Sequence, residues 1–528
     1  MRSWSHAFVL PCAVAALVVT GGLEAKSQRL NGGNFARAPV GDGYRGDGFR
    51  GGGFGVGGAA LGLGIGRAIL GGVARPPPQQ VYSGDDDPVP ARPRPHKRKP
   101  GPVARIIAAP PRQAPPPVRV VPTPVRPGFT VPASDERRYV PDEVLVTIRA
   151  RVSPEQVRRF EVDYSLTPLA ITRIALLDAS VRRYRLRERT SVPQAIRALR
   201  GSPPFVASVQ PNFVFALQDD ASGQPSAPMK DASRTDGVSA SATEPDKPVQ
   251  YAVTALKLVD AHRVATGAHV LIAIIDTGLD ESHPEINGMV ADRFDAVGGR
   301  FVAHPHGTAM AGVIVAHQTL VGIAPDAHLI AIRAFSSLSS GGTSGTSYDI
   351  LRGLDFAVGH GGQIVNMSFA GPQDPLLRDA LAAAHGRGIV AIAAAGNAGP
   401  GSKPLYPAAE PGVIAVTATD ARSKIFAMAN RGAYVAFAAP GVDVLAPGLG
   451  GGIQLTSGTS IATAEASGVA ALLIERSGRA TPDFIRKRLS DTARHLPGEA
   501  AAAGAGVIDA YAAVSAGDPS TAPVNHRP

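Results

Sequence analysis

Apolar runs of strand length recur through the second half of this chain, and helical patterns separate several of them. Runs without polar alternation are typical of strands buried on both faces, and their alternation with helices favours a parallel sheet that is covered on either side. We therefore predict a doubly wound α/β domain over residues 250–515, long enough to enclose one sizeable core. The predicted strands are Leu271–Ile275, Leu329–Ala334, Ile364–Met367, Ile389–Ala394, Val413–Ala418 and Val435–Ala438, and the helices include His306–Ala316, Tyr348–Val358 and Leu376–Arg387.

Three motifs place reactive side chains at the ends of such elements, where parallel sheets collect their chemistry. Asp276 begins an Asp-Thr-Gly motif after the first strand, His306 begins a His-Gly-Thr motif, and Ser460 ends a Gly-Thr-Ser motif that opens a helix. A serine hydroxyl is a weak nucleophile, so it needs an imidazole to take its proton and a carboxylate to orient that imidazole. The three together predict a catalytic triad, although each motif alone is equally typical of a turn or a helix cap.

Asn397 follows the predicted strand Ile389–Ala394. Acyl transfer needs hydrogen-bond donors directed at the oxyanion of the transition state, and the side-chain amide of Asn397 and the backbone N–H of Ser460 are the predicted donors. The alternative is that Asn397 only caps a turn. We interpret His304 as a solvated loop residue, because only His306 is followed by Gly-Thr and a helical pattern.

The order Asp, His, Ser is that of one known family. From about Tyr251 to Val514 the chain resembles the catalytic domain of the subtilisin-like serine endopeptidases, or subtilases. The resemblance implies that the protein hydrolyses peptide bonds of polypeptide substrates through an acyl-enzyme. Further matching motifs are His283-Pro284, Gly322-Ile323-Ala324-Pro325, Val365-Asn366-Met367-Ser368, Tyr406-Pro407-Ala408 and Ala439-Pro440-Gly441.

The resemblance also implies where a substrate binds. One segment takes the place of a family strand whose backbone pairs with the substrate, and a second segment walls the pocket for the side chain before the scissile bond. Small and apolar lining favours apolar side chains and discriminates weakly between them. The implied substrate-binding residues are Ser368, Phe369, Ala370 and Gly371 in the first segment and Ala394, Ala395 and Gly396 in the second.

Two residues depart from the family in the helix that begins at Ser460. Ala464 and Glu465 stand where the family commonly has Pro and His. Without a proline the helix is expected to continue. Glu465 is harder to accommodate, because the predicted helix Ser460–Ile474 is apolar nearly all round and an unpaired carboxylate is costly to bury. We expect Glu465 to have a partner or a water-filled edge.

The first 25 residues are predicted to be a signal peptide. Arg2 precedes the apolar stretch Ala7–Val19, which is too short to span a membrane, and Ala25 offers a cleavage site. The one cysteine, Cys12, lies in this segment, so the mature chain is expected to lack disulfides. These features predict a secreted or periplasmic/cell-envelope protein.

Residues 26–134 are predicted to be a disordered arm, first Gly-rich and then Pro-rich. Much of the formal net charge of +10 lies between Pro88 and Ala133, where no acidic residue occurs. This part is either a soluble spacer or a tether to an anionic envelope surface. Nuclear targeting through Lys97-Arg98-Lys99 conflicts with the signal peptide, and no nucleic-acid partner is expected. Gly51–Ala74 is either a flexible spacer or a membrane-associated segment.

Residues 140–218 are predicted to form a ferredoxin-like α+β domain, because their patterns follow the order β-α-β-β-α-β. The position of this domain, and its ending Val209-Gln210-Pro211-Asn212, resemble the inhibitory propeptide of subtilases. The resemblance implies an intramolecular inhibitor that is cleaved off in the linker 219–249, and the alternative is a permanently retained accessory domain. Residues 516–528 are predicted to be a disordered tail.

The predicted chemistry requires no cofactor. Structural calcium is common in subtilases, but no acidic cluster with a recognisable ligand spacing assigns a metal site here. Two other classes of function compete with a subtilase. One is a non-enzymatic envelope adaptor that is tethered by its cationic arm and whose site is spoiled by Glu465 or by a misplaced loop. The other is a sedolisin-type peptidase, which would place Glu as the base and Asp at the oxyanion, and His306 and Asn397 argue against it.

Overall fold

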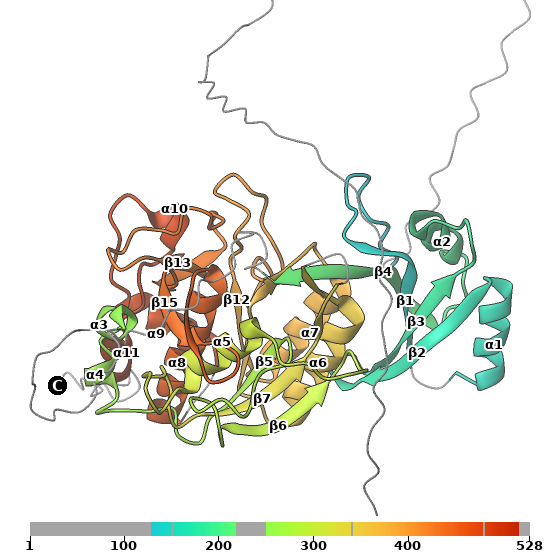
Figure 1. Cartoon of the computed structure of the whole chain (residues 1–528). Coiled ribbons are helices and arrows are strands. Elements are labelled where there is room, and N and C mark those ends of the chain that lie inside the picture. Colours follow the sequence, from blue (N-terminus) through green and yellow to red (C-terminus); the bar gives the residue numbers. More distant parts are fainter. Residues whose placement is uncertain (1–127, 150–151, 218–249, 339–341, 479–480, 517–528) are drawn as a thin grey trace, which may run out of the picture. The chain divides into compact units, whose positions relative to one another are not determined.

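The computed structural model describes residues 128–149, 152–217, 250–338, 342–478 and 481–516. The predicted signal peptide, most of the predicted arm, the linker 219–249 and nearly all of the tail lie outside the described residues. An antiparallel sheet formed mainly by residues 139–217 precedes a parallel sheet built from residues 271–440 (Figure 1). Among the described residues, no helix is both long and apolar enough to cross a membrane.

Seven parallel strands form the sheet of the second domain, in the order β14-β13-β12-β10-β5-β7-β6. The chain starts at β5, extends the sheet on one side through β6 and β7, and then extends it on the other, so the sheet is doubly wound as predicted. The six predicted strands are confirmed to within two residues at their ends. The apolar pattern misses β6, because its residues alternate between half-buried and exposed and none of them is fully buried. The strands are β5 Leu271–Asp276, β6 Val290–Asp295, β7 His328–Arg333, β10 Ile364–Met367, β12 Val390–Ala394, β13 Ile414–Thr419 and β14 Val435–Pro440.

Helices cover both faces of this sheet (Figure 1). Successive strand residues point to opposite faces, so Ile272 and Ile274 join one core and Ala273 and Ile275 the other. The first core contains α5 (Pro305–Val315) and α8 (Thr459–Ser477), and the second contains α6 (Ser347–Gly359) and α7 (Pro375–Gly386). The remaining elements of this domain are α3 Tyr251–Ala255, α4 Leu258–Ala261, β8 Phe335–Ser337, β9 Thr343–Thr346, β11 Phe369–Ala370, β15 Val444–Pro447, β16 Ile453–Thr456, α9 Pro482–Thr492, α10 Ala500–Ala503 and α11 Ala510–Ser515.

The first domain has the element order β-α-β-β-α-β and an antiparallel sheet in the order β2-β3-β1-β4. Both of its helices begin at a serine whose side chain takes part in a capping box, Ser153 for α1 and Ser191 for α2. The helices pack on one face of the sheet. The elements are β1 Tyr139–Arg149, α1 Pro154–Asp163, β2 Leu166–Ile174, a short 3-10 turn Ala175–Leu177, β3 Ala179–Leu186, α2 Val192–Leu199 and β4 Val206–Leu217.

The predicted end of the arm at Ser134 is too late. Phe129 is buried in the core of the first domain. The backbone on either side of it pairs with β4, because Thr130 N–H donates to Val209 O and Val209 N–H donates to Gly128 O, both over 2.9 Å. The Pro-rich composition of the preceding residues hides this short ordered segment.

The sequence pattern predicts a closing strand over Phe205–Pro211, but β4 continues to Leu217. Val214 to Ala216 pair antiparallel with β9, and Ala216 and Leu217 pair antiparallel with β11. Both partner strands belong to the second domain, so the local sequence of β4 cannot reveal them.

Candidate active site

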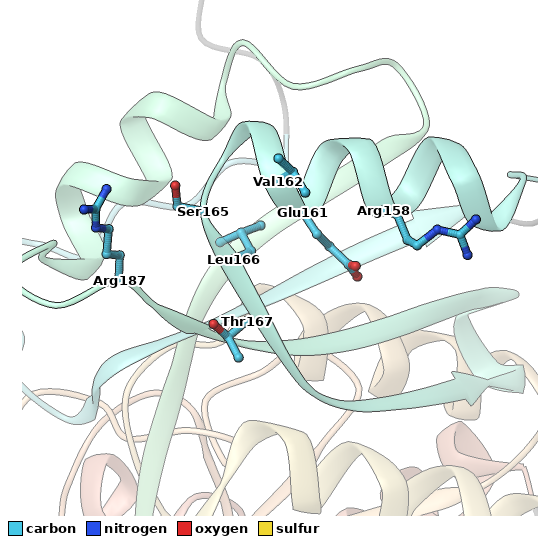
Figure 2. A pocket seen from close by; sticks show the side chains of 7 residues that line it. All are labelled: Arg158, Glu161, Val162, Ser165, Leu166, Thr167 and Arg187. Atoms are coloured by element: carbon cyan, nitrogen blue, oxygen red, sulfur yellow. The ribbon is translucent and has the colours of Figure 1, made fainter.

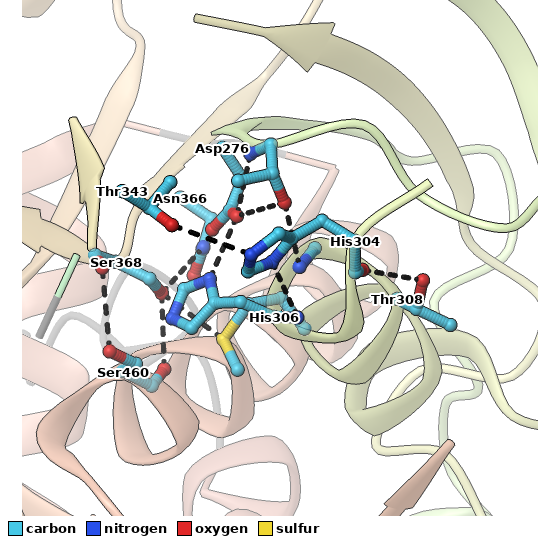
Figure 3. Close-up of polar contacts among 11 residues, drawn as sticks. Asp276, His304, His306, Thr308, Thr343, Asn366, Ser368 and Ser460 are labelled. Atoms are coloured by element: carbon cyan, nitrogen blue, oxygen red, sulfur yellow. Dashed lines mark hydrogen bonds and ion pairs between the residues drawn. The ribbon is translucent and has the colours of Figure 1, made fainter. Parts of the chain in front are cut away.

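Asp276 and His306 meet at the carboxyl end of β5 (Figure 3). His306 lies in the first turn of α5, and its Nδ1 is 2.7 Å from Oδ1 of Asp276. The same Oδ1 accepts hydrogen bonds from Thr277, from the backbone N–H over 2.7 Å and from Oγ1 over 3.1 Å. Both acid and imidazole are buried. A carboxylate fixed in this way holds the imidazole ring in one orientation and favours the tautomer protonated at Nδ1.

Ser460 lies in the first turn of α8 and is fully buried. Its Oγ is 3.4 Å from the backbone oxygen of Ser368, and the Oγ of Ser368 is 3.1 Å from the backbone oxygen of Ser460. In the view of Figure 3, the imidazole of His306 lies between Asp276 and Ser460. The structure therefore brings the three predicted triad residues together from β5, α5 and α8.

Asn397 is tied to the start of the same helix, α8. Its Oδ1 accepts two hydrogen bonds from Thr459, from the backbone N–H over 3.1 Å and from Oγ1 over 2.8 Å. Thr459 Oγ1 in turn accepts from Gly396 N–H over 3.2 Å. Because these bonds hold the amide by its oxygen, the orientation of the donor group Nδ2 is set as well. Asn397 thus does more than cap its own turn.

His304 is not a solvated loop residue, contrary to the sequence interpretation. It is the N-cap of α5, and its Nδ1 accepts from the backbone N–H of His306 over 3.2 Å. Its backbone oxygen also accepts from Thr308 Oγ1 over 2.9 Å. His304 therefore fixes the start of the helix that carries His306. The signal that could have revealed it is Pro305, because a proline in the first helical turn marks the preceding residue as the cap.

The predicted substrate-binding strand is already paired. Phe369 and Ala370 form β11, which pairs with Leu217 and Ala216 at the end of β4. Since β4 also pairs with β9, its last residues lie between two strands of the second domain. The first domain thus occupies the edge that a substrate is expected to use.

Gly371 lies against an aromatic ring from β4. Phe215 is fully buried, and its ring packs edge-to-face on Phe369 with 5.8 Å between the ring centroids. A Cβ atom on Gly371 would come within 2.4 Å of the Phe215 ring, so this position needs a glycine. Of the other predicted wall, Ala394 and Ala395 are fully buried.

Glu465 has no hydrogen-bond partner among the described residues at either carboxyl oxygen, although it is fully buried. It lines an internal cavity of about 10 Å³ together with Gln250, Gly312 and Val321. Burial raises the pKa of Glu465 well above its usual range. Of the two surroundings expected for Glu465, a partner is absent among the described residues, and burial favours the uncharged form of the acid. Ala464 has the predicted effect, because α8 continues past it to Ser477.

Two further features of the described residues bear on the choice of site. No cluster of three or more His, Cys, Asp or Glu side chains that could hold a metal ion occurs among the described residues. A hollow of about 550 Å³ on the first domain is lined by neither histidine nor cysteine. Figure 2 shows its two guanidinium groups, from Arg158 and Arg187, at opposite ends rather than converging on one point.

Comparison with known proteins gives one consistent family. The subtilase family (Peptidase_S8) pattern matches residues 267–507. Subtilisin E from Bacillus subtilis (strain 168) is 33% identical over 275 residues, which cover 50% of this chain and 71% of the relative. Subtilisin from Bacillus pumilus is 32% identical over 275 residues and 98% of its length is covered. The crystal structure of fervidolysin from Fervidobacterium pennivorans matches with a TM-score of 0.60 at 24% identity, covering 72% of this chain and 62% of that one.

Proposed function

Because this chain belongs to the subtilase family and is a subtilisin-like serine endopeptidase, we propose that Ser460, His306 and Asp276 carry its catalysis. The hydrogen bond of 2.7 Å between His306 Nδ1 and Asp276 Oδ1 is the observation that carries this assignment. It keeps a proton on Nδ1, so Nε2 takes the proton of Ser460 as its Oγ attacks the peptide carbonyl. Nε2 then returns that proton to the leaving amine, and water releases the acyl group by the same steps.

The oxyanion is assigned to two donors at the start of α8. One is Nδ2 of Asn397, because Thr459 holds the amide by its oxygen. The other is the backbone N–H of Ser460, which lies in the first turn of the helix, where backbone N–H groups are not used by the helix itself. Donors held in place before the reaction stabilise the developing charge at little cost in reorganisation.

The chain is further proposed to be a zymogen, with residues 140–218 as its intramolecular inhibitor and cleavage in the linker 219–249. Two observations support this. The nucleophile Ser460 is fully buried. The end of β4 pairs with both β9 and β11, and an extended polypeptide substrate would need the same backbone groups.

Polar contacts hold the proposed inhibitor against two helix N-termini of the enzyme. Gln210 accepts from the N–H of Leu376 over 3.1 Å and donates to Asp374, the N-cap of α7, over 2.7 Å. Asn212 accepts from the N–H of Tyr348, in the first turn of α6, over 3.2 Å. Unpaired N–H groups at a helix start favour such oxygen acceptors, so these contacts fix the position of β4.

Location and accessory partners rest on sequence features outside the described residues. The apolar stretch Ala7–Val19 supports a secreted or envelope location, and the basic segment Pro88–Ala133 supports contact with an anionic envelope surface. No metal takes part in the proposed chemistry.

The proposed function is tested by reaction with a fluorophosphonate probe and by intact-mass measurement, comparing the parent chain with Ser460→Ala. We expect the parent to lose its N-terminal part and then to label at one serine, whereas the variant keeps its full mass and does not label. Labelling at another serine would contradict the assigned nucleophile. Labelling of Ser460 without any self-cleavage would support the assigned nucleophile but contradict the proposal that the chain is a zymogen.

A further inference from the structure

A series of hydrogen bonds that does not include His306 connects three polar side chains to the proposed nucleophile, Ser460. Its members are Ser467 on α8, Asn366 on β10 and Ser368 directly after β10, and all three side chains are fully buried. Asn366 and Ser368 are two residues apart in extended backbone, so both side chains point to the face of the sheet that α8 covers.

Each hydrogen bond in this chain sets the role of the next group. The Ser467 hydroxyl has one proton and two acceptors within reach, Oδ1 of Asn366 at 3.0 Å and the backbone oxygen of Thr463 at 2.9 Å. An amide that accepts through its oxygen presents Nδ2 on the other side, and this Nδ2 donates to Ser368 Oγ over 3.0 Å. Since the Ser368 hydroxyl has one proton and already accepts from Asn366, it donates that proton onward.

The acceptor is the nucleophile's own backbone. Ser368 Oγ is 3.1 Å from the backbone oxygen of Ser460 and 3.3 Å from the sulfur of Met310, which is the weaker acceptor. The backbone oxygen of Ser368 is 3.4 Å from Ser460 Oγ. Figure 3 shows these two contacts between the same pair of serines. The Ser368 side chain therefore holds the peptide group of Ser460, and the Ser368 backbone oxygen accepts from the Ser460 hydroxyl in this unreacted arrangement.

We propose that Ser467 and Asn366 are positioning residues of the enzyme, which act through the Ser368 side chain to hold the backbone of Ser460, and with it the start of α8 from which Oγ projects. This inference rests on the proposed role of Ser460. Neither residue touches the substrate or the proton in transit, so both act on the rate of acylation rather than on binding. A misplacement of about 1 Å costs on the order of 10²-fold in rate, so partial loosening is measurable.

Ser467→Ala tests the first link. We expect kcat and the rate of fluorophosphonate labelling to fall about tenfold, with KM changed by less than about twofold. Ser467→Thr keeps the hydroxyl and is expected to restore most of the rate. Asn366→Leu removes both of its hydrogen bonds and is expected to cost about 100-fold in kcat. Thermal unfolding of each variant separates loss of rate from loss of fold.

Thr463→Val is the matched control. Thr463 is also fully buried on α8, and its hydroxyl donates to the backbone oxygen of Thr459 over 2.7 Å, one turn back along the helix. We expect its kcat to stay within about twofold of the parent, with a change in Tm like that of Ser467→Ala. The inference is overturned if Ser467→Ala loses no more rate than Thr463→Val, or if its loss lies in KM. A parent enzyme that never labels would overturn the proposed function and this inference together.

Discussion

The two sheets of this molecule bury their faces in different ways. Both faces of the parallel sheet are covered by helices of the same domain. The antiparallel sheet covers one face with its own helices, α1 and α2, around Val146, Phe160 and Ile196. On the other face, Leu145 and Phe215 join the core that contains α6 and α7 of the second domain. The first domain therefore completes its core only against the second.

The difference shows which domain can do without the other. A small domain has little core of its own, so one that buries half of its sheet on a partner loses much of its stability when the partner is absent. When the first domain leaves, the larger domain keeps the core around α5 and α8 whole, because this core is built from its own residues alone. The core around α6 and α7 loses the first-domain side chains but keeps those of its own strands and helices, and β9 and β11 lose their pairing with β4. A dependence in one direction suits an inhibitor that is removed from an enzyme that stays.

The largest effect is expected from removing the proposed nucleophile, Ser460. Because the variant is not expected to cleave itself, both domains stay in one chain and can be compared. Ser460→Ala is expected to lower kcat on the order of 10⁶-fold, because the hydroxyl that we propose forms the acyl-enzyme is gone. The N-terminal part should then remain attached, which intact-mass measurement reports. A variant that processes itself at the parental rate would show that another nucleophile, or another protease, makes the cut.

Two core substitutions in the Ser460→Ala chain test the direction of dependence. Phe160→Ala opens the first domain's own core, and Phe437→Ala opens the core of the second, each at a cost of about 3–5 kcal/mol. Hydrogen exchange of the strand amides is the measurement. We expect Phe160→Ala to lower protection in β1 but not in β10, and Phe437→Ala to lower it in both. An equal loss of amide protection in β10 in the two variants would show that the second domain depends on the first as much as the first depends on the second.

Asn397→Ala tests whether the chemistry belongs to the second domain alone. The variant loses one donor to the oxyanion, so kcat is expected to fall about 10²- to 10³-fold with KM nearly unchanged. The hydrogen bonds from Thr459 hold Asn397 at the start of α8, so the protection of β11 amides in the uncleaved chain should stay as in the parent. A rise in KM with kcat intact would assign Asn397 to substrate binding instead.

The sequence predicts the parallel sheet well, for a physical reason. Strands buried on both faces are continuously apolar, so runs such as Ile364–Met367 identify themselves without knowledge of their neighbours. Asp276 could be predicted because a strand end carries its motif, and the sheet then brings it to His306, 30 residues away. Motifs at the ends of elements therefore predict the candidate site residues more accurately than the apolar patterns predict where each element begins and ends.

The features that the sequence does not predict are contacts between residues that are far apart along the chain. The extension of β4 past Pro211 exists because β9 and β11 offer unpaired backbone groups, and no local pattern encodes that. The polar link from Ser467 to Asn366 joins residues 101 positions apart. For Glu465 the apolar helix pattern predicts burial correctly, but only the packed structure shows that no described group pairs with it.

The smallest expected effect concerns two buried carboxyl groups, Asp374 and Glu465, and the way stability depends on pH. Asp374, where the domains meet, accepts from Ser347, Gln210 and two N–H groups of α7, whereas Glu465 in the second domain has no partner among the described residues. Burial raises the pKa of Glu465, so between the usual carboxyl range and that raised value the folded chain keeps a proton that the unfolded chain loses. The free energy of unfolding therefore falls as pH rises through this window.

Glu465→Gln tests this pH dependence, because the glutamine side chain cannot ionise. The Ser460→Ala chain with Glu465→Gln should have the same Tm as the Ser460→Ala chain alone within about 2 °C near pH 4. Toward pH 8 its Tm should become increasingly higher, by roughly 2–4 °C for each kcal/mol regained. A difference in Tm that stays constant from pH 4 to pH 8 would mean that Glu465 keeps an ordinary pKa in the folded chain.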